Sequence, residues 1–135
     1  MHRTTSPDHS DHGIEREIIA KGLTAPRITP ADIEENIASE HYFTAGDGVV
    51  GAMLRADIEQ KAPQSAPDKH STQPLLLLTF CVLVLRNGFT VTGESACASP
   101  EIFDAEIGRR IARANAVQKI WPLMGYELRT RLAGS

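Results

Sequence analysis

A single stretch of the chain is apolar at almost every position. Residues 75–85 read LLLLTFCVLVL, and residues 89–95, FTVTGES, alternate between polar side chains and apolar or small ones. Asn87 and Gly88 lie between the two runs, and an Asn-Gly pair in this setting is the strongest short-range hairpin signal. The sequence therefore predicts an antiparallel β-hairpin of strands 75–85 and 89–95, closed by a two-residue type I′ turn.

The first of these strands is apolar on both of its faces. With a two-residue turn, Val84 pairs with Val91 and Leu83 with Thr92, so only the second strand has a polar face. A strand that is apolar on both sides is typical of a sheet covered on both sides, and an isolated hairpin is marginally stable. We therefore expect a third strand, from HYFTA or VVGAML within residues 41–54, or a second copy of the chain, and we favour a homo-oligomer.

A long C-terminal helix is expected over residues 100–121. Ser99 is its predicted N-cap and Pro100 its first residue, and Pro122 sets a boundary or kink. Apolar side chains recur along it at helical spacing, which predicts that one stripe covers the hairpin. The stripe consists of Phe103, Ile107, Ile111, Ala114, Val117 and Trp121.

Shorter elements precede the hairpin. Thr29 is a plausible N-cap for a helix at about 30–41, whose first residue would be a proline. The glycine-rich residues 46–51 predict a flexible turn before a short helix at about 49–60, with a ligand-binding loop as the alternative. The fold class is α+β: the hairpin packed by the long C-terminal helix and by these shorter N-terminal helices.

Length and composition set the domain organisation. A chain of 135 residues is the size of one domain. Residues 1–26 are polar and are expected to form a mobile tail with a short helix at 14–21, and residues 27–135 form the single α+β domain. Within that domain, the Pro-, Ser- and Gln-rich residues 60–74 predict a flexible linker.

Charge and cysteine content narrow the class of protein. The formal net charge of −3 disfavours a nucleic-acid binder that relies on bulk positive charge. No apolar run is long enough for a membrane span and no signal-peptide pattern is present, so a cytoplasmic location is expected. The cysteines Cys81 and Cys97 do not form a disulfide framework; Cys81 is read as a small buried side chain, and the role of Cys97 stays open.

The connection GESACAS, residues 93–99, is the candidate ligand site. Ser95 and Ser99 offer hydroxyls beside the expected helix N-terminus, where unpaired N–H groups attract anions. Arg109 or Arg113 of a neighbouring chain would complete the contacts. The alternative is a purely structural connection. In that case Ser99 caps the helix, and Glu101 and Asp104 already interact with the positive end of its dipole and would repel an anion.

Motifs for catalysis are absent from the sequence. It contains no dinucleotide fingerprint or P-loop, no HExxH, no CxxC, and no serine nucleophile in an elbow context. His9 and His12 in DHSDH could share a helix face, but short-range ligands alone make a weak metal site. We therefore expect neither enzymatic activity nor a cofactor or metal.

Two long segments resemble a known family. The run GFTVTGESACASPE followed by FDAEIGR, together with ITPADIEENIASEHYFTAGDGV, is similar to the gene product 49/66 family of small proteins from tailed phages and prophages. The resemblance covers about residues 27–132, without the linker at 60–74. It implies a phage accessory protein that acts in the host cytoplasm, and it carries over no catalytic residues.

Two functions fit these observations. The first is a non-enzymatic binding protein that captures a small anionic, nucleotide-like ligand to counter host defence, through Ser95, Ser99, Arg109 and Arg113. The second is an interaction module that docks a host enzyme through an acidic helix carrying Glu34, Glu35 and Glu40.

Overall fold

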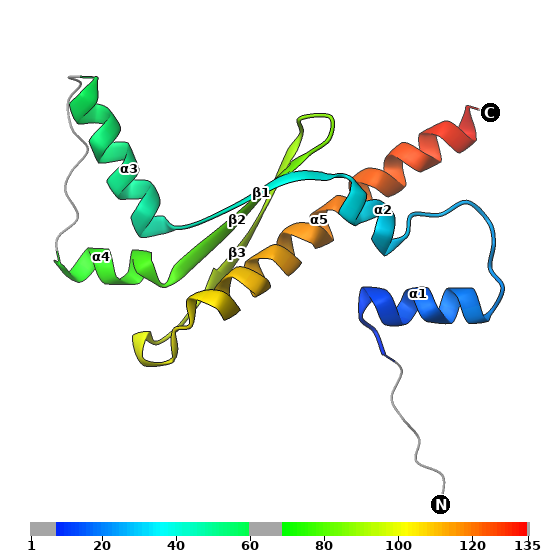
Figure 1. Cartoon of the computed structure of the whole chain (residues 1–135), viewed down its shortest axis with the longest axis horizontal. Coiled ribbons are helices and arrows are strands. Elements are labelled where there is room, and N and C mark those ends of the chain that lie inside the picture. Colours follow the sequence, from blue (N-terminus) through cyan, green and yellow to red (C-terminus); the bar gives the residue numbers. More distant parts are fainter. Residues whose placement is uncertain (1–7, 60–68, 135) are drawn as a thin grey trace, which may run out of the picture. The chain divides into compact units, whose positions relative to one another are not determined.

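The computed structural model describes residues 8–59 and 69–134 and divides the chain into two compact units. One unit combines Met1–Asn36 with Trp121–Ser135, and the other is Ile37–Ile120. The predicted α+β class is confirmed by an antiparallel sheet packed with helices (Figure 1). The predicted mobile tail and linker include residues 1–7 and 60–68, which lie outside the described residues.

Three strands form the sheet of the larger unit, in the order β1-β2-β3. They are β1 (Ile37–Thr44), β2 (Leu78–Leu85) and β3 (Thr90–Ala96). The expected third strand is confirmed, and it comes from the segment that contains HYFT. The helix predicted at 30–41 is confirmed at its start, with Thr29 as its N-cap and Pro30 as its first residue, and is wrong in its length. α2 (Pro30–Glu35) ends at its C-cap Asn36, and residues 37–41 belong to β1.

The hairpin between β2 and β3 has a longer turn than predicted. Val84 pairs with Thr90 and Leu83 with Val91, so the predicted register is wrong by one residue. The loop has three residues and ends at Gly88, which has a φ of 89° and an N–H that donates to the Leu85 carbonyl at 2.9 Å. Such a loop is the next most common hairpin connection after the two-residue turn. It puts Val91 on the same face of the sheet as Leu83.

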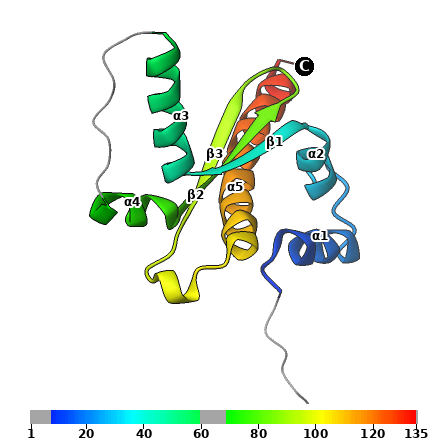
Figure 2. The same cartoon turned by 60° about the vertical axis from the view of Figure 1, so that its left-hand side comes forward.

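Helix α5 (Ala105–Ala133) runs along one face of the sheet with its residues up to Ile120 (Figures 1 and 2). The helix backbone lies unusually close to β3, because a Cβ added to Gly93 would lie 2.1 Å from the Ala112 carbonyl oxygen. The predicted stripe is mostly wrong: Ile107 and Ile111 are exposed, and small residues face the sheet instead. The buried residues of α5 are Gly108, Ala112, Ala116, Val117 and Ile120.

The ends of α5 also differ from the prediction. Pro100 begins a short 3-10 turn, η1 (Pro100–Ile102), and Ser99 makes no side-chain capping bond to it. The true cap is Asp104, whose carboxylate accepts the Ile107 N–H at 3.0 Å. At the other end the helix continues through Pro122 to Ala133, beyond the end predicted at residue 121.

The glycine-rich segment is helical. Thr44 and Asp47 form a capping box that begins α3 (Ala45–Ile58): each side chain accepts the other's backbone N–H, at 3.1 and 2.9 Å. The predicted turn or loop at 46–51 is therefore wrong. Gly46 packs beside α4 (Lys69–Leu76): a Cβ there would lie 2.7 Å from Cδ2 of the Leu76 side chain. The end of the predicted linker, residues 69–74, belongs to this helix.

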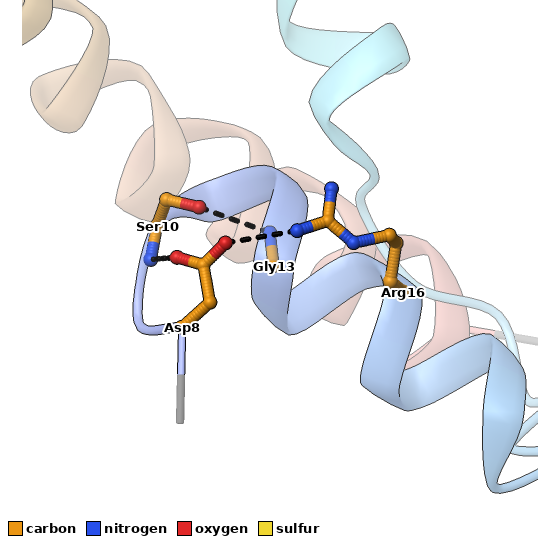
Figure 3. A network of polar contacts seen from close by, with 4 residues as sticks. All are labelled: Asp8, Ser10, Gly13 and Arg16. Carbon is orange, nitrogen blue, oxygen red and sulfur yellow. Dashed lines mark hydrogen bonds and ion pairs between the residues drawn. The ribbon is translucent and has the colours of Figure 1, made fainter. Parts of the chain in front are cut away.

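The smaller unit contains α1 (Asp11–Ala20), which confirms the short helix predicted near 14–21. Figure 3 shows its N-terminus: Ser10 accepts the Gly13 N–H, and Asp8 accepts the Ser10 N–H while pairing with Arg16 at 2.8 Å. The hydrogen bonds from Ser10 are the main cause that holds the pKa of Asp8 below its usual value. None of the helices described is long and apolar enough to cross a membrane.

Candidate functional site

The connection between β3 and α5 does not present the predicted serines together. Ser99 donates its hydroxyl hydrogen bond to the Glu101 carboxylate, which lowers the pKa of Glu101, and its carbonyl accepts from the Cys97 thiol at 3.2 Å. Ser95 lies on β3 opposite Thr79 of β2. Because α5 begins at Ala105, its unpaired N–H groups are not at Ser99. The helix-terminus argument for an anion site at 93–99 is therefore lost.

Arg113 and Glu40, expected in two different sites, form one ion pair. The Arg113 Nε lies 3.0 Å from a Glu40 oxygen, and the other Glu40 oxygen accepts from the Tyr42 hydroxyl at 3.2 Å. Burial, with the nearby Cys81 and Glu40, raises the pKa of Tyr42 to about 12, and burial raises the pKa of Cys81. Both groups are thus protonated at neutral pH, and the cluster joins α5 to β1 and β2 without a reactive thiolate.

A cavity lies where β1 leads into α3. Its volume is about 140 Å³, and it lies within the larger unit. This volume is close to that of an enclosed apolar cavity of about 150 Å³ that is known to bind benzene, but the cavity here opens to solvent beside the exposed Asp47 and Arg109. The lining residues are Tyr42, Phe43, Thr44, Asp47, Thr79, Phe103, Ala105 and Arg109.

Thr79 gives this cavity an unsatisfied polar group. Its side chain is 3% exposed, and its hydroxyl oxygen has no hydrogen-bond partner among the described residues. A hydroxyl buried in this way costs about 1–3 kcal/mol unless a ligand or a water molecule satisfies it. Gly108 of α5 keeps the space beside the hydroxyl, because a Cβ there would lie 3.1 Å from it.

Charged groups of both signs face the cavity. Arg109 is exposed and makes no hydrogen bond or ion pair with the described part of the chain. Asp47 is held by the Thr44 N–H at the start of α3, where the helix dipole is positive. The cavity therefore combines aromatic walls, a buried hydroxyl, a fixed carboxylate and a guanidinium without a partner in the structure described.

Most of the lining was missed by sequence reasoning, which named only Arg109. Two signals were available: Thr79 is the one hydroxyl in the apolar run LLLLTFCVLVL, and Thr44 with Asp47 repeats the T-x-x-D pattern of Thr29 and Asp32. That pattern is a helix-start signature, and it would have placed a helix N-terminus directly after β1.

The acidic residues expected to face a partner are divided between the two units. Glu34 and Glu35 lie on α2 and are exposed, whereas Glu40 lies on β1 in the ion pair with Arg113. They do not share one helix, so the predicted acidic helix that carries all three glutamates is wrong: α2 carries only Glu34 and Glu35. Among residues 8–59 and 69–134, no group of three or more His, Cys, Asp and Glu side chains could hold a metal ion.

The fold defines a small α+β protein with a three-stranded antiparallel sheet, one long helix and a small polar-aromatic cavity. The chain belongs to the Phage protein (N4 Gp49/phage Sf6 gene 66) family, whose model matches residues 28–132. This confirms the resemblance seen in the sequence. No curated protein and no solved structure matches the chain.

Proposed function

We propose that this phage-family protein is a non-enzymatic binding protein for a small anionic, nucleotide-like ligand, held in the cavity beside α3. The observation that carries the proposal is the buried Thr79 hydroxyl, which has no partner among the described residues, in a cavity that Arg109 also lines. The site proposed is thus the β1–α3 junction and not the connection 93–99.

The chemistry of the lining suggests how such a ligand would bind. A cavity of about 140 Å³ accommodates one ring of a nucleobase, against the aromatic side chains of Tyr42 and Phe103. Ring N–H groups would donate to Asp47, and the Thr79 hydroxyl would gain its missing partner. A phosphate is too polar for the interior and would remain at the rim, on the exposed guanidinium of Arg109.

The phage family suggests a source for this ligand. A host cell that signals infection with a nucleotide would be countered by a protein that removes the nucleotide from solution. Capture alone suffices for this purpose, so the proposal needs no catalytic residue and no cofactor. The site of action would be the host cytoplasm.

The experiment is a binding screen on the purified chain with a broad set of mononucleotides, dinucleotides and cyclic nucleotides, read by thermal shift and then by calorimetry. Arg109→Ala is expected to weaken binding about tenfold or more, which corresponds to a lost charge-assisted hydrogen bond. The matched control is Arg110→Ala, the neighbouring exposed arginine that does not line the cavity, and its Kd should equal that of the wild type.

Thr79→Val separates binding from folding. The substitution removes the buried hydroxyl and keeps the shape, so stability should be unchanged or higher, while ligand affinity falls. Absence of a thermal shift with every nucleotide at millimolar concentration would contradict the proposal. Equal loss of affinity in Arg109→Ala and Arg110→Ala would contradict the assignment to this cavity.

Docking of a host enzyme is the second candidate. It would use Glu34 and Glu35, which are exposed on α2. Reversing both charges should abolish salt-sensitive capture of a single host protein if this function holds.

A further inference from the structure

The carboxylate of Asp47 has spare hydrogen-bonding capacity at the cavity beside α3. Its Oδ2 accepts the Thr44 N–H at 2.9 Å, and its Oδ1 makes no hydrogen bond or ion pair with the described part of the chain. An ionised carboxylate accepts hydrogen bonds at about four lone-pair sites, so capping α3 uses only part of this capacity. Because Asp47 lines the cavity and the capping box fixes it, it offers the cavity a pair of acceptors in a set position.

A hydrogen-bond donor lies beside these acceptors. The Thr44 hydroxyl accepts the Asp47 N–H at 3.1 Å and keeps its own proton, for which the described residues supply no acceptor. Thr44 also lines the cavity. The wall formed by the start of α3 thus presents a hydroxyl donor next to an acceptor with two oxygens.

We propose that the ligand of this cavity is a guanine nucleotide, an inference that rests on the proposed function. Guanine carries two adjacent donors, the ring N1–H and the N2 amino group, and the acceptor O6 lies next to them. The two donors fit the Asp47 carboxylate, and O6 fits the Thr44 hydroxyl. This edge belongs to the six-membered ring, which is the part of the base that a cavity of about 140 Å³ accommodates.

The other common bases lack this pattern. Adenine and cytosine present one amino group beside a ring nitrogen that accepts, and uracil presents one N–H between two carbonyl oxygens. Each of them would place a lone pair opposite the Asp47 carboxylate, which repels it in addition to losing a hydrogen bond. Because Asp47 is exposed, water competes for its oxygens, so we expect about a tenfold effect for each lost bond and not the larger factors of enclosed sites.

The second capping box of the chain supplies a matched control. Thr29 and Asp32 hold the start of α2 with the same two hydrogen bonds, at 3.1 and 2.9 Å, and neither residue lines the cavity. Asp47→Asn and Asp32→Asn therefore make the same change in the same local motif, and only the first alters the cavity. In both variants the amide oxygen can still accept the threonine N–H, so both should fold, which circular dichroism checks.

The test is calorimetry with guanosine, inosine and adenosine monophosphate (GMP, IMP and AMP), which share the ribose and phosphate and differ only in the base. IMP lacks only the N2 amino group, so the wild type should bind it about tenfold more weakly than GMP. AMP also lacks the N1–H and should bind more weakly still. In Asp47→Asn an amide nitrogen replaces the free acceptor, so GMP and IMP should bind within about twofold of each other. Asp32→Asn should keep the tenfold preference for GMP.

The two proposals fail in different ways. If no nucleotide binds at millimolar concentration, both are wrong. If nucleotides bind and Arg109→Ala weakens them, but GMP, IMP and AMP have the same Kd within twofold, the binding function stands and the assignment to guanine is overturned. A GMP preference that survives in Asp47→Asn also overturns it, because another group would then select the base. Equal loss of the preference in Asp47→Asn and Asp32→Asn overturns it as well.

Discussion

The two faces of the sheet come from the same strands, yet one is sealed and the other is half-exposed. On the face covered by α5, Leu83 is 0% exposed and Val91 7% exposed. On the opposite face, which we call the open face, Phe80, Val82 and Val84 are only partly buried. The difference lies in residue size: Gly93 on β3 and the small residues of α5 let the two backbones approach closely. Side chains on the covered face should therefore contribute more to the free energy of unfolding than those on the open face.

The largest effect is expected at Gly93. In Gly93→Ala the added methyl would lie 2.1 Å from the Ala112 carbonyl and 2.3 Å from the Ala116 nitrogen, both of them backbone atoms that cannot rotate away. Overpacking a core costs about 1–3 kcal/mol, and a clash with backbone should reach or exceed the upper value. Urea unfolding followed by circular dichroism measures the loss.

Gly51→Ala is the matched control. It adds the same methyl in α3, at a position with no atom within 4 Å. Alanine is favoured over glycine in a helix by up to about 1 kcal/mol, so this variant should be slightly more stable than the wild type. If Gly93→Ala and Gly51→Ala change the free energy of unfolding equally, α5 is not packed against β3 as described.

Valine truncation compares the two faces directly. Val91→Ala removes buried methyl groups and should cost about 2 kcal/mol, from the lost burial and the space left behind. Val84→Ala makes the same chemical change on the open face and should cost less than about 1 kcal/mol, because Val84 is only partly buried. Equal losses in the two variants would show that both faces are sealed within one chain.

The sequence predicted the elements of this sheet better than the contacts between them. The apolar run and the Asn-Gly pair revealed the hairpin, but Gly88 also suits a three-residue loop, and one extra loop residue moved Val91 to the face of Leu83. The helical stripe with Ile107 was a real periodicity, yet the small-residue face of α5 is buried, because it permits the closest approach. Periodicity identifies faces without showing which face is covered.

The candidate site was harder to predict than the elements, because it depends on contacts between them. Arg109 was recognised by its charge, but the cavity exists only because β1 precedes α3 directly and Thr79 lies beneath that junction. The predicted helix at 30–41 included the first residues of β1, and the predicted glycine turn at 46–51 stood in place of the start of α3. The junction between β1 and α3 was therefore not predicted. The capping box of Thr44 and Asp47 was the local signal that would have corrected them.

A smaller effect is expected from Tyr42, at the edge of the covered face. Burial is the main cause that raises its pKa to about 12, from a usual value near 10. The folded state therefore binds the phenol proton more tightly than the unfolded state, so stability is complete below pH 10 and falls as the pH rises toward 12. One pKa unit corresponds to about 1.4 kcal/mol, so the full value for this shift would be about 2.7 kcal/mol. Because the ring is only partly buried, we expect a smaller loss of about 1 kcal/mol.

Absorbance of the phenolate checks this prediction in a Tyr126→Phe background, where Tyr42 is the only tyrosine. The midpoint should lie near pH 12 in folded protein and near pH 10 in urea. A midpoint near 10 in both conditions would mean that the Tyr42 hydroxyl is open to water. In that case α5 would not shield this edge of the sheet.

The smallest effect is expected from the ion pair of Arg113 and Glu40, which links α5 to β1 beside the covered face. The side chains are 29% and 41% exposed, so water screens the pair, and pairs of this kind contribute about 0.2–1 kcal/mol. A double-mutant cycle with Arg113→Met and Glu40→Gln should give a coupling energy of about 0.5 kcal/mol, lower in 0.5 M salt. Its matched control is a cycle with Arg110→Met in place of Arg113→Met, which should show no coupling with Glu40→Gln. A coupling above about 2 kcal/mol would show that the pair is desolvated. The part of the sheet that α5 shields from water would then include β1.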